Sequence, residues 1–207
     1  MAGSDTFSTY IAPGGLAAAD PNGICLTQTP GGAVNLTING ALQSGGVATL
    51  VPARNVTITS GGSSETGKTF TVTGTATDGT AVTEAIAGPG SSATVSTTAL
   101  FETVTQVAVD GATAGAVTVG SGTTVNQVVF AGRTRLRGIY FVNSAAAGVL
   151  DFKNGSSSGT TVIQFMTSGT ANTADYPDIP DEGVLCSDGA YVNFTTTDVT
   201  AFTVFYN

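Results

Sequence analysis

The stretch Thr69-Phe-Thr-Val-Thr-Gly-Thr-Ala-Thr77 alternates threonine with apolar or small residues without a break. Side chains of a β-strand point to opposite faces in turn, so Phe70, Val72 and Ala76 share one face and the threonines the other. Apolar residues on one face and β-branched polar residues on the other are typical of a strand that covers a core with one side. We therefore expect a half-buried strand here.

The surrounding sequence extends this pattern. Asp78-Gly79 is a two-residue hairpin signal, and Val82 to Ile86 supplies the expected return strand. Period-two patterns recur at 55–60, 104–109 and 116–119, and no window of ten residues has a 3.6-residue repeat. The sequence predicts an all-β protein.

Composition divides the 207 residues into three segments. Residues 1–29 are rich in Gly, Ala and Pro, which predicts an extended N-terminal arm. Residues 30–122 carry Thr/Val strands and predict a β-sandwich domain, whereas residues 123–207 hold most of the aromatic side chains and predict a β-sandwich or jelly-roll-like domain. The expected fold is therefore two β-sandwich-like domains preceded by an extended arm.

Charge and histidine content remove several classes of function. The chain has no histidine, which excludes the usual serine and cysteine triads and most zinc sites. Its net charge of −8 repels phosphate backbones, so we expect no nucleic-acid partner. No apolar run is long enough for a membrane helix, and the amino terminus lacks the pattern of a secretory signal. We expect a soluble protein without catalytic residues, metal or cofactor.

The two cysteines, Cys25 and Cys186, each stand next to apolar residues. The simpler interpretation is a pair of reduced thiols that pack as small hydrophobic side chains. A disulfide between them remains open, because spacing alone does not decide it.

Three of the six basic residues alternate along one segment: Arg133, Arg135 and Arg137. On a strand, all three point to the same side. One interpretation is a solvated edge strand whose charges prevent mispairing. The other is a docking face for acidic residues, because the guanidinium fork pairs with carboxylates at two points.

A second concentration of charge lies in Asp175-Tyr-Pro-Asp-Ile-Pro-Asp-Glu-Gly183. Two prolines make a rigid surface loop the simpler interpretation, and a contact surface the other. Calcium is the one metal that an all-oxygen set would suit, but the spacing lacks the order of an EF-hand. The candidate interaction residues are Asp175, Asp178, Asp181 and Glu182.

The middle of the chain resembles a known family. Six stretches of sequence, in this order, account for the resemblance: Asn35-Leu-Thr-Ile-Asn-Gly-Ala-Leu, Arg54-Asn-Val-Thr-Ile-Thr-Ser-Gly, Gly67-Lys-Thr-Phe-Thr-Val-Thr-Gly-Thr, Asp78-Gly-Thr-Ala-Val-Thr-Glu-Ala-Ile-Ala-Gly-Pro, Phe101-Glu-Thr-Val-Thr-Gln-Val and Gly111-Ala-Thr-Ala-Gly-Ala-Val-Thr-Val-Gly. Together they resemble a β-domain that recurs in virion structural proteins of tailed bacteriophages. Arg135-Leu-Arg-Gly-Ile-Tyr-Phe-Val-Asn and Ala201-Phe-Thr-Val-Phe-Tyr more loosely resemble β-rich outer domains of phage head and tail proteins.

The resemblance implies a non-enzymatic protein that decorates or cements the capsid surface after synthesis in the host cytoplasm. The implied partners are the major capsid protein and further copies of the chain, with a homotrimer or another homo-oligomer as the expected assembly. The alternative is a tail, fibre or surface adhesin module that binds a receptor or glycan. A sugar site needs exposed aromatic side chains, and only Tyr176 and Tyr191 stand near loop signals.

Overall fold

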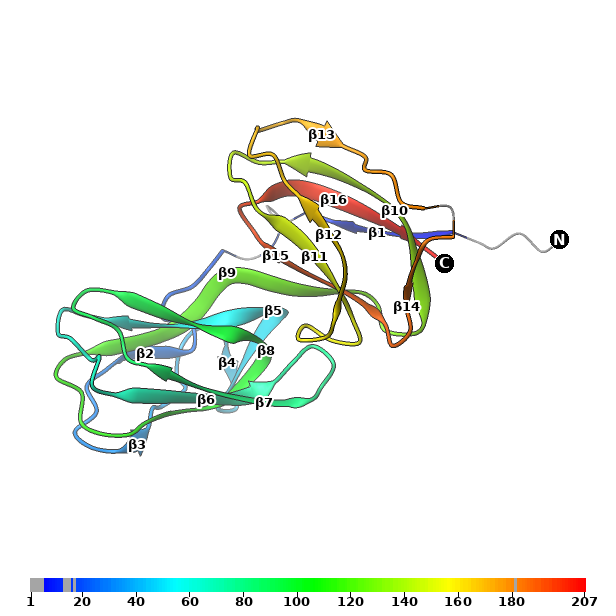
Figure 1. The fold of residues 1–207 in the computed structure, drawn as a ribbon. Coiled ribbons are helices and arrows are strands. Elements are labelled where there is room, and N and C mark those ends of the chain that lie inside the picture. The colour runs from blue at the N-terminus through cyan, green and yellow to red at the C-terminus, as the bar shows by residue number, and fades with distance from the viewer. Residues whose placement is uncertain (1–5, 13–15, 17, 181) are drawn as a thin grey trace. The chain divides into compact units, whose positions relative to one another are not determined.

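The computed structural model describes residues 6–12, 16, 18–180 and 182–207, and within them every regular element is a strand (Figure 1). The expected all-β class is confirmed. The hairpin around Asp78-Gly79 is present as β6 (Thr69–Thr75) and β7 (Ala81–Ala87), which pair along their whole length. Phe70 and Val72 are fully buried, as the alternation predicts.

The chain divides into two compact units. Ala18–Thr123 form one, here called the Thr/Val unit, and Met1–Ala17 with Thr124–Asn207 form the other, the aromatic unit. Strand β9 (Val117–Phe130) passes through the division, so its first half belongs to the Thr/Val unit and its second half to the aromatic unit. The sequence-based boundary at 122/123 lies one residue from this point.

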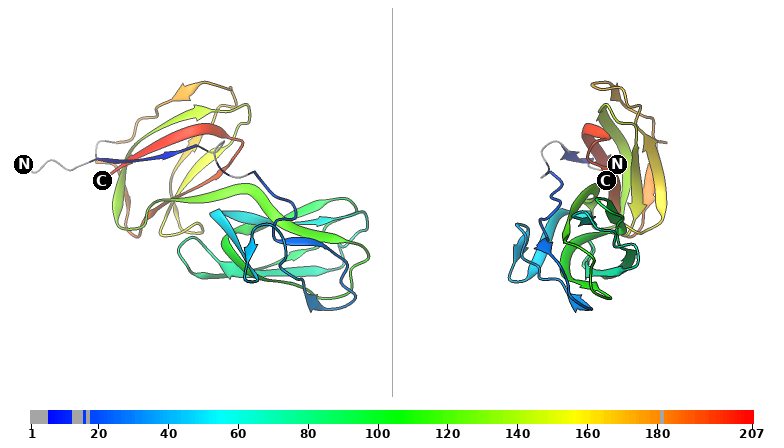
Figure 2. Two further views of the ribbon diagram at one scale, coloured as in Figure 1. Left: turned by 180° about the vertical axis from the view of Figure 1, so that it is seen from behind. Right: turned by 90° about the vertical axis from the view of Figure 1, so that its left-hand side faces the viewer.

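The N-terminal arm differs from the expectation, because its described residues are shared between the two units. Strand β1 (Phe7–Ile11) pairs with β16 (Val199–Tyr206) of the aromatic unit, and Figure 2 shows the two strands side by side. Strand β2 (Cys25–Gln28) pairs instead with β9 in the Thr/Val unit. These strands are too short to show a sustained alternation, and their partners lie about 90 to 200 residues away in sequence.

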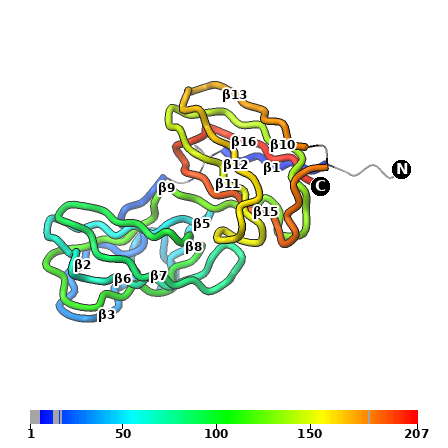
Figure 3. The backbone as a smooth tube through the Cα atoms, in the orientation of Figure 1, coloured from blue at the N-terminus to red at the C-terminus, as the bar shows by residue number. Residues whose placement is uncertain are grey.

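The Thr/Val unit contains one sheet with strand order β9-β5-β8-β6-β7. Its long strands, β5 (Val47–Ser60) and β8 (Thr94–Val109), pair with register shifts that bend them. Two short strands, β3 (Val34–Asn35) and β4 (Gln43–Ser44), pair with β8 and β5. Strands β6 and β7 come last in the strand order of this sheet, and Figure 3 shows the path of the chain through them.

The aromatic unit consists of two sheets. One has the order β1-β16-β10-β13, in which β10 is Thr134–Asn143 and β13 is Ala174–Asp175. A further short strand, β14 (Val184–Cys186), also pairs with β10. The other has the order β12-β11-β15-β9, with β11 (Val149–Asn154), β12 (Thr161–Met166) and β15 (Ala190–Thr195).

Each unit has its own core. In the Thr/Val unit it contains small and β-branched side chains around Phe70 and Phe101. In the aromatic unit, phenylalanines from both sheets meet: Phe194 of β15 and Phe202 of β16 stack edge to face, with ring centroids 5.1 Å apart. The expectation that the aromatic side chains enlarge this core holds for these rings.

Candidate interaction surface

The arginine segment lies at the beginning of β10. Arg135 and Arg137 are on the strand and flank the buried Leu136, whereas Arg133 precedes the strand in a bend and is exposed. The interpretation as a solvated edge strand is wrong, because β10 pairs with β16 on one side and with β13 and β14 on the other. Protection of a sheet edge therefore does not explain why three arginines lie close together at this strand.

The acidic segment runs beside the same strand. Asp175 belongs to β13 and pairs opposite Phe141 of β10, and its Oδ2 accepts a hydrogen bond from Asn143 Nδ2 at 2.6 Å. Asp178 and Glu182 are exposed. Asp181 lies outside the described residues. The segment is thus attached to β10 at both ends, through β13 and β14.

The structure brings the two charged segments together through the main chain. Arg135 Nη1 donates hydrogen bonds to the carbonyl oxygens of Glu182 at 3.0 Å and Gly183 at 3.3 Å. Gly183 has a positive φ of 69°, and a Cβ there would lie 3.0 Å from Arg137 Cδ. Both arginines therefore lie beside the end of the acidic segment, with Arg135 fixing its backbone.

Aromatic side chains occupy the outer face of the same sheet. The register places Tyr10 of β1, Thr203 of β16 and Tyr140 of β10 in one row across three strands. Tyr10 is 68% exposed and Tyr140 41% exposed. In the next row Phe205 lies between Ser8 and Gly138 and is half-buried.

Tyr176 extends this row. It is 67% exposed, and its hydroxyl oxygen lies 3.1 Å from the position that a Cβ on Gly138 would occupy. Phe205 Cδ2 lies 3.5 Å from that position, so the glycine leaves room for both rings. We call this surface the tyrosine/arginine face; it consists of Tyr10, Arg135, Arg137, Tyr140, Tyr176 and Phe205.

Sequence reasoning assigned most of the C-terminal aromatic residues to the core and so missed this face. The alternation in Gly138-Ile-Tyr-Phe141 contains the signal, because Ile139 and Phe141 point inward and Tyr140 outward. What the sequence does not show is that β1 and β16 bring Tyr10 and Phe205 next to it. Tyr191, named with Tyr176 as a possible sugar contact, is buried and does not serve that role.

The titratable groups offer little chemistry. Among the described residues no group of three or more cysteine or acidic side chains could hold a metal ion. Both cysteines are free and buried, and burial raises the pKa of Cys25 to about 12 and that of Cys186 to about 11. They pack as small apolar side chains, in agreement with the simpler of the two interpretations.

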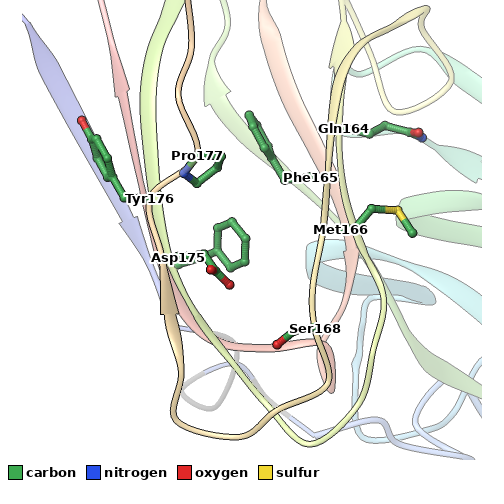
Figure 4. A pocket seen from close by; sticks show the side chains of 8 residues that line it. Gln164, Phe165, Met166, Ser168, Asp175, Tyr176 and Pro177 are labelled. Atoms are coloured by element: carbon green, nitrogen blue, oxygen red, sulfur yellow. The ribbon is translucent and has the colours of Figure 1, made fainter.

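An open pocket of about 450 Å³ lies in the aromatic unit between β12 and β13. Figure 4 shows Asp175 and Phe165 directed into it, whereas the ring of Tyr176, which lines the rim just after β13, points to the other side of the chain. Phe141 of β10 also lines it. The pocket therefore adjoins the tyrosine/arginine face, because Tyr176 lines the pocket and also belongs to the face.

No protein-family model matches the chain, and no curated protein matches it. In the described residues there is no helix of the length and apolarity needed to cross a membrane.

Proposed function

We propose that this chain is a non-enzymatic structural protein of a bacteriophage virion that binds the assembled capsid shell through its tyrosine/arginine face. The exposed tyrosine and arginine side chains of this face are the observation that supports the docking role. The resemblance of residues 30–122 to a recurrent phage β-domain supplies the virion setting. The capsid surface is the proposed location and the major capsid protein the proposed partner.

The composition of the face suits protein docking. Tyrosine and arginine are enriched at the centres of protein interfaces, because they bury large area at a small entropic cost and still form hydrogen bonds. Strand pairing supports two of these side chains, because Tyr140 lies opposite Thr203 of β16 and Arg135 opposite Leu185 of β14. A chain of net charge −8 places half of its basic residues at 133–137, so this end of the face fits an acidic partner surface.

Copies of the chain are also proposed to assemble with one another on the shell. A decoration protein on a symmetric shell gains affinity when it binds as a closed homo-oligomer, and a homotrimer fits the three-fold sites. Among the described strands β1 pairs only with β16, so its other edge is open beside the face, where Phe7 is also exposed.

The alternative function is a tail, fibre or adhesin module that binds a receptor or glycan. Tyr176 favours it, because an exposed aromatic ring on a sheet face is a platform on which a sugar ring stacks. In the described part of the acidic segment Tyr176 is a single exposed ring, whereas the larger face combines several aromatic side chains with arginines and is the better-supported site.

The decisive experiment counts copies of the protein in purified particles and locates them by electron microscopy. Hundreds of copies on the head support decoration, and a few copies at the tail support the alternative. Absence from every particle of the phage that encodes it rejects both.

A variant test then assigns the binding surface. The double variant Tyr10→Ser/Tyr140→Ser is expected to lower affinity for shells about tenfold or more, because each central tyrosine contributes roughly 1 kcal/mol or more. Arg133→Ser/Arg137→Ser is expected to lower it by a smaller, salt-dependent factor and to leave folding unchanged. Val51→Ser, at an exposed apolar side chain of the Thr/Val unit, is the control. Equal losses in the control and in the tyrosine variant would reject the face.

A further inference from the structure

The pocket in the aromatic unit adjoins a strand edge that lacks a partner. Strand β12 ends the order β12-β11-β15-β9, and in the described part of the chain only β11 pairs with it. An edge strand presents unpaired N–H and C=O groups on its open side at every second residue. The main chain of β12 is therefore available for hydrogen bonds to a further strand.

The sequence of β12 gives this edge neither charge nor proline, and its one irregularity is a bulge at Val162, where the register with β11 steps from Ile163 to Thr161. Thr161-Val-Ile-Gln-Phe-Met166 has no charge and no proline, and it is rich in residues that favour strands. Natural proteins usually protect such edges with charge, proline or a bulge on the open side, because an uncharged edge strand pairs with other chains. An edge of this kind is a liability unless a partner covers it.

The pocket next to the edge provides side-chain recognition. Phe165 points from β12 toward the interior, and together with the buried Phe141 it gives the pocket an apolar wall (Figure 4). Asp175 enters from the opposite side, and Asn143 holds its Oδ2 at 2.6 Å. No basic residue is among the described residues that line the pocket, so this carboxylate has no cationic partner there.

We propose that the β12 edge binds an extended, basic segment of a partner protein by strand addition. The segment pairs its main chain with 163–166, beyond the bulge, places an apolar side chain against Phe165 and directs a lysine or arginine to Asp175. Main-chain hydrogen bonds give such a site affinity, and the pocket for alternate side chains gives it specificity. The strand edge at 163–166 is separate from the tyrosine/arginine face, which shares only Tyr176 with the pocket, and the proposal does not depend on a virion role.

The test is affinity selection of a randomised library of ten-residue peptides on the full-length protein. The expected selected sequences have apolar residues at every second position and an enriched lysine or arginine. Asp175→Asn is expected to abolish the preference for a basic residue and to weaken binding of the best basic peptide about two- to fivefold, which is the range for a partly exposed ion pair. Asparagine keeps a side-chain oxygen that accepts from Asn143.

Asp178→Asn is the matched control, because Asp178 is an exposed carboxylate of the same segment that does not line the pocket. It should leave the basic preference intact. Hydrogen exchange with the best peptide bound should show new protection at 163–166. Selection without a basic preference, no selection at all, or equal effects of the two substitutions would overturn the proposal.

Protection at a different open edge, such as Phe7–Ile11 or Ala81–Ala87, would also overturn it. Concentration-dependent dimerisation that protects 163–166 without peptide would show that a second copy covers the edge instead. Sedimentation of the protein alone distinguishes that outcome from binding of a foreign segment.

Discussion

Glu65 is a buried carboxylate whose role is to hold a turn. It is 1% exposed, and its two oxygens accept the backbone N–H groups of Ala114 and Gly115 at 2.9 and 2.8 Å. Glu65→Gln replaces one acceptor with an NH₂ group that faces a donor. We expect a loss of about 1–3 kcal/mol in the free energy of unfolding, measured by urea denaturation.

Glu84 provides the matched control for this prediction. Its oxygens also accept two backbone N–H groups, from Thr98 and Ala99, but the side chain is half-buried. Water can replace one of these bonds, so Glu84→Gln is expected to cost less than about 1 kcal/mol. Equal losses for the two variants would show that burial does not decide the cost.

Asp198 makes stability depend on pH in an unusual direction. Burial raises the pKa of its carboxyl above the ordinary value, although backbone and side-chain hydrogen bonds around Thr195 oppose that shift. The folded protein therefore holds this proton to a higher pH than the unfolded chain does. The stabilising contribution is present at low pH and is lost as the pH rises from the ordinary value through the raised one.

Asp198→Asn should remove this dependence. The free energy of unfolding of the original protein, minus that of the variant, is expected to fall between pH 3 and neutrality. Asp188 is the opposite case, because hydrogen bonds from Ser187 and Asn154 lower its pKa. The corresponding difference for Asp188→Asn should increase with pH. A difference that rises with pH for Asp198→Asn would contradict the assignment.

At the scale of elements, Asn143 fixes the segment that forms one side of the pocket. Its Oδ1 accepts the N–H of Ser168 at 2.9 Å, and its Nδ2 donates to Thr173 and Asp175. Asn143 is fully buried, so Asn143→Ala removes these bonds without water to replace them. We expect amide exchange at Ser168 and across 172–175 to accelerate.

The matched variant is Asn154→Ala. Asn154 is half-buried and bonds Ser187 and Asp188 in a comparable way. Its removal should accelerate exchange at Asp188 and leave Ser168 unchanged. If both variants loosen the same segment, Asn143 is not its specific anchor.

Local pattern predicts the elements of this fold well where neighbours in sequence pair. The hairpin of β6 and β7 follows from alternation and from Asp78-Gly79, where Gly79 adopts a φ of 79°. The period-two pattern at 116–119 marks only the beginning of β9, which continues through Gly120 and Gly122 to Phe130. In the structure a Cβ at Gly120 would meet the carbonyl of Asp20 at 2.0 Å, so this glycine permits close packing within a strand.

The candidate site was predictable only in part, for a related reason. Alternation predicts that Arg133, Arg135 and Arg137 share one face of a strand. In the structure Arg133 precedes β10 and the register shifts at Arg137, so regular alternation fails, although Arg135 and Arg137 both lie beside Gly183. Their position near Phe205 depends on the pairing of β10 with β16, about 60 to 70 residues apart, and their position near Tyr10 depends on the pairing of β1 with β16, almost 200 residues apart; no local pattern contains either. The docking role of these arginines stays a prediction.

At the scale of the whole molecule, each cysteine reports on one unit. Cys25 is buried in the Thr/Val unit and Cys186 in the aromatic unit, and burial raises the pKa values of both thiols. Thiolate is the reactive form, so neither should react with iodoacetamide until its unit opens. Labelling in increasing urea, read by mass spectrometry, therefore measures the stability of each unit within the intact chain.

Substitutions in the two cores turn this into a test of independence. Val72→Ala removes two buried methyl groups from the Thr/Val core and Val204→Ala removes two from the aromatic core, each at a cost of about 2 kcal/mol. We expect Val72→Ala to shift the labelling midpoint of Cys25 more than that of Cys186, and Val204→Ala to do the reverse. Strand β9 continues from one unit into the other, so a smaller shift at the second thiol measures how far this strand transmits the loss. Equal shifts at both thiols in both variants would show that two separate cores unfold as one cooperative unit.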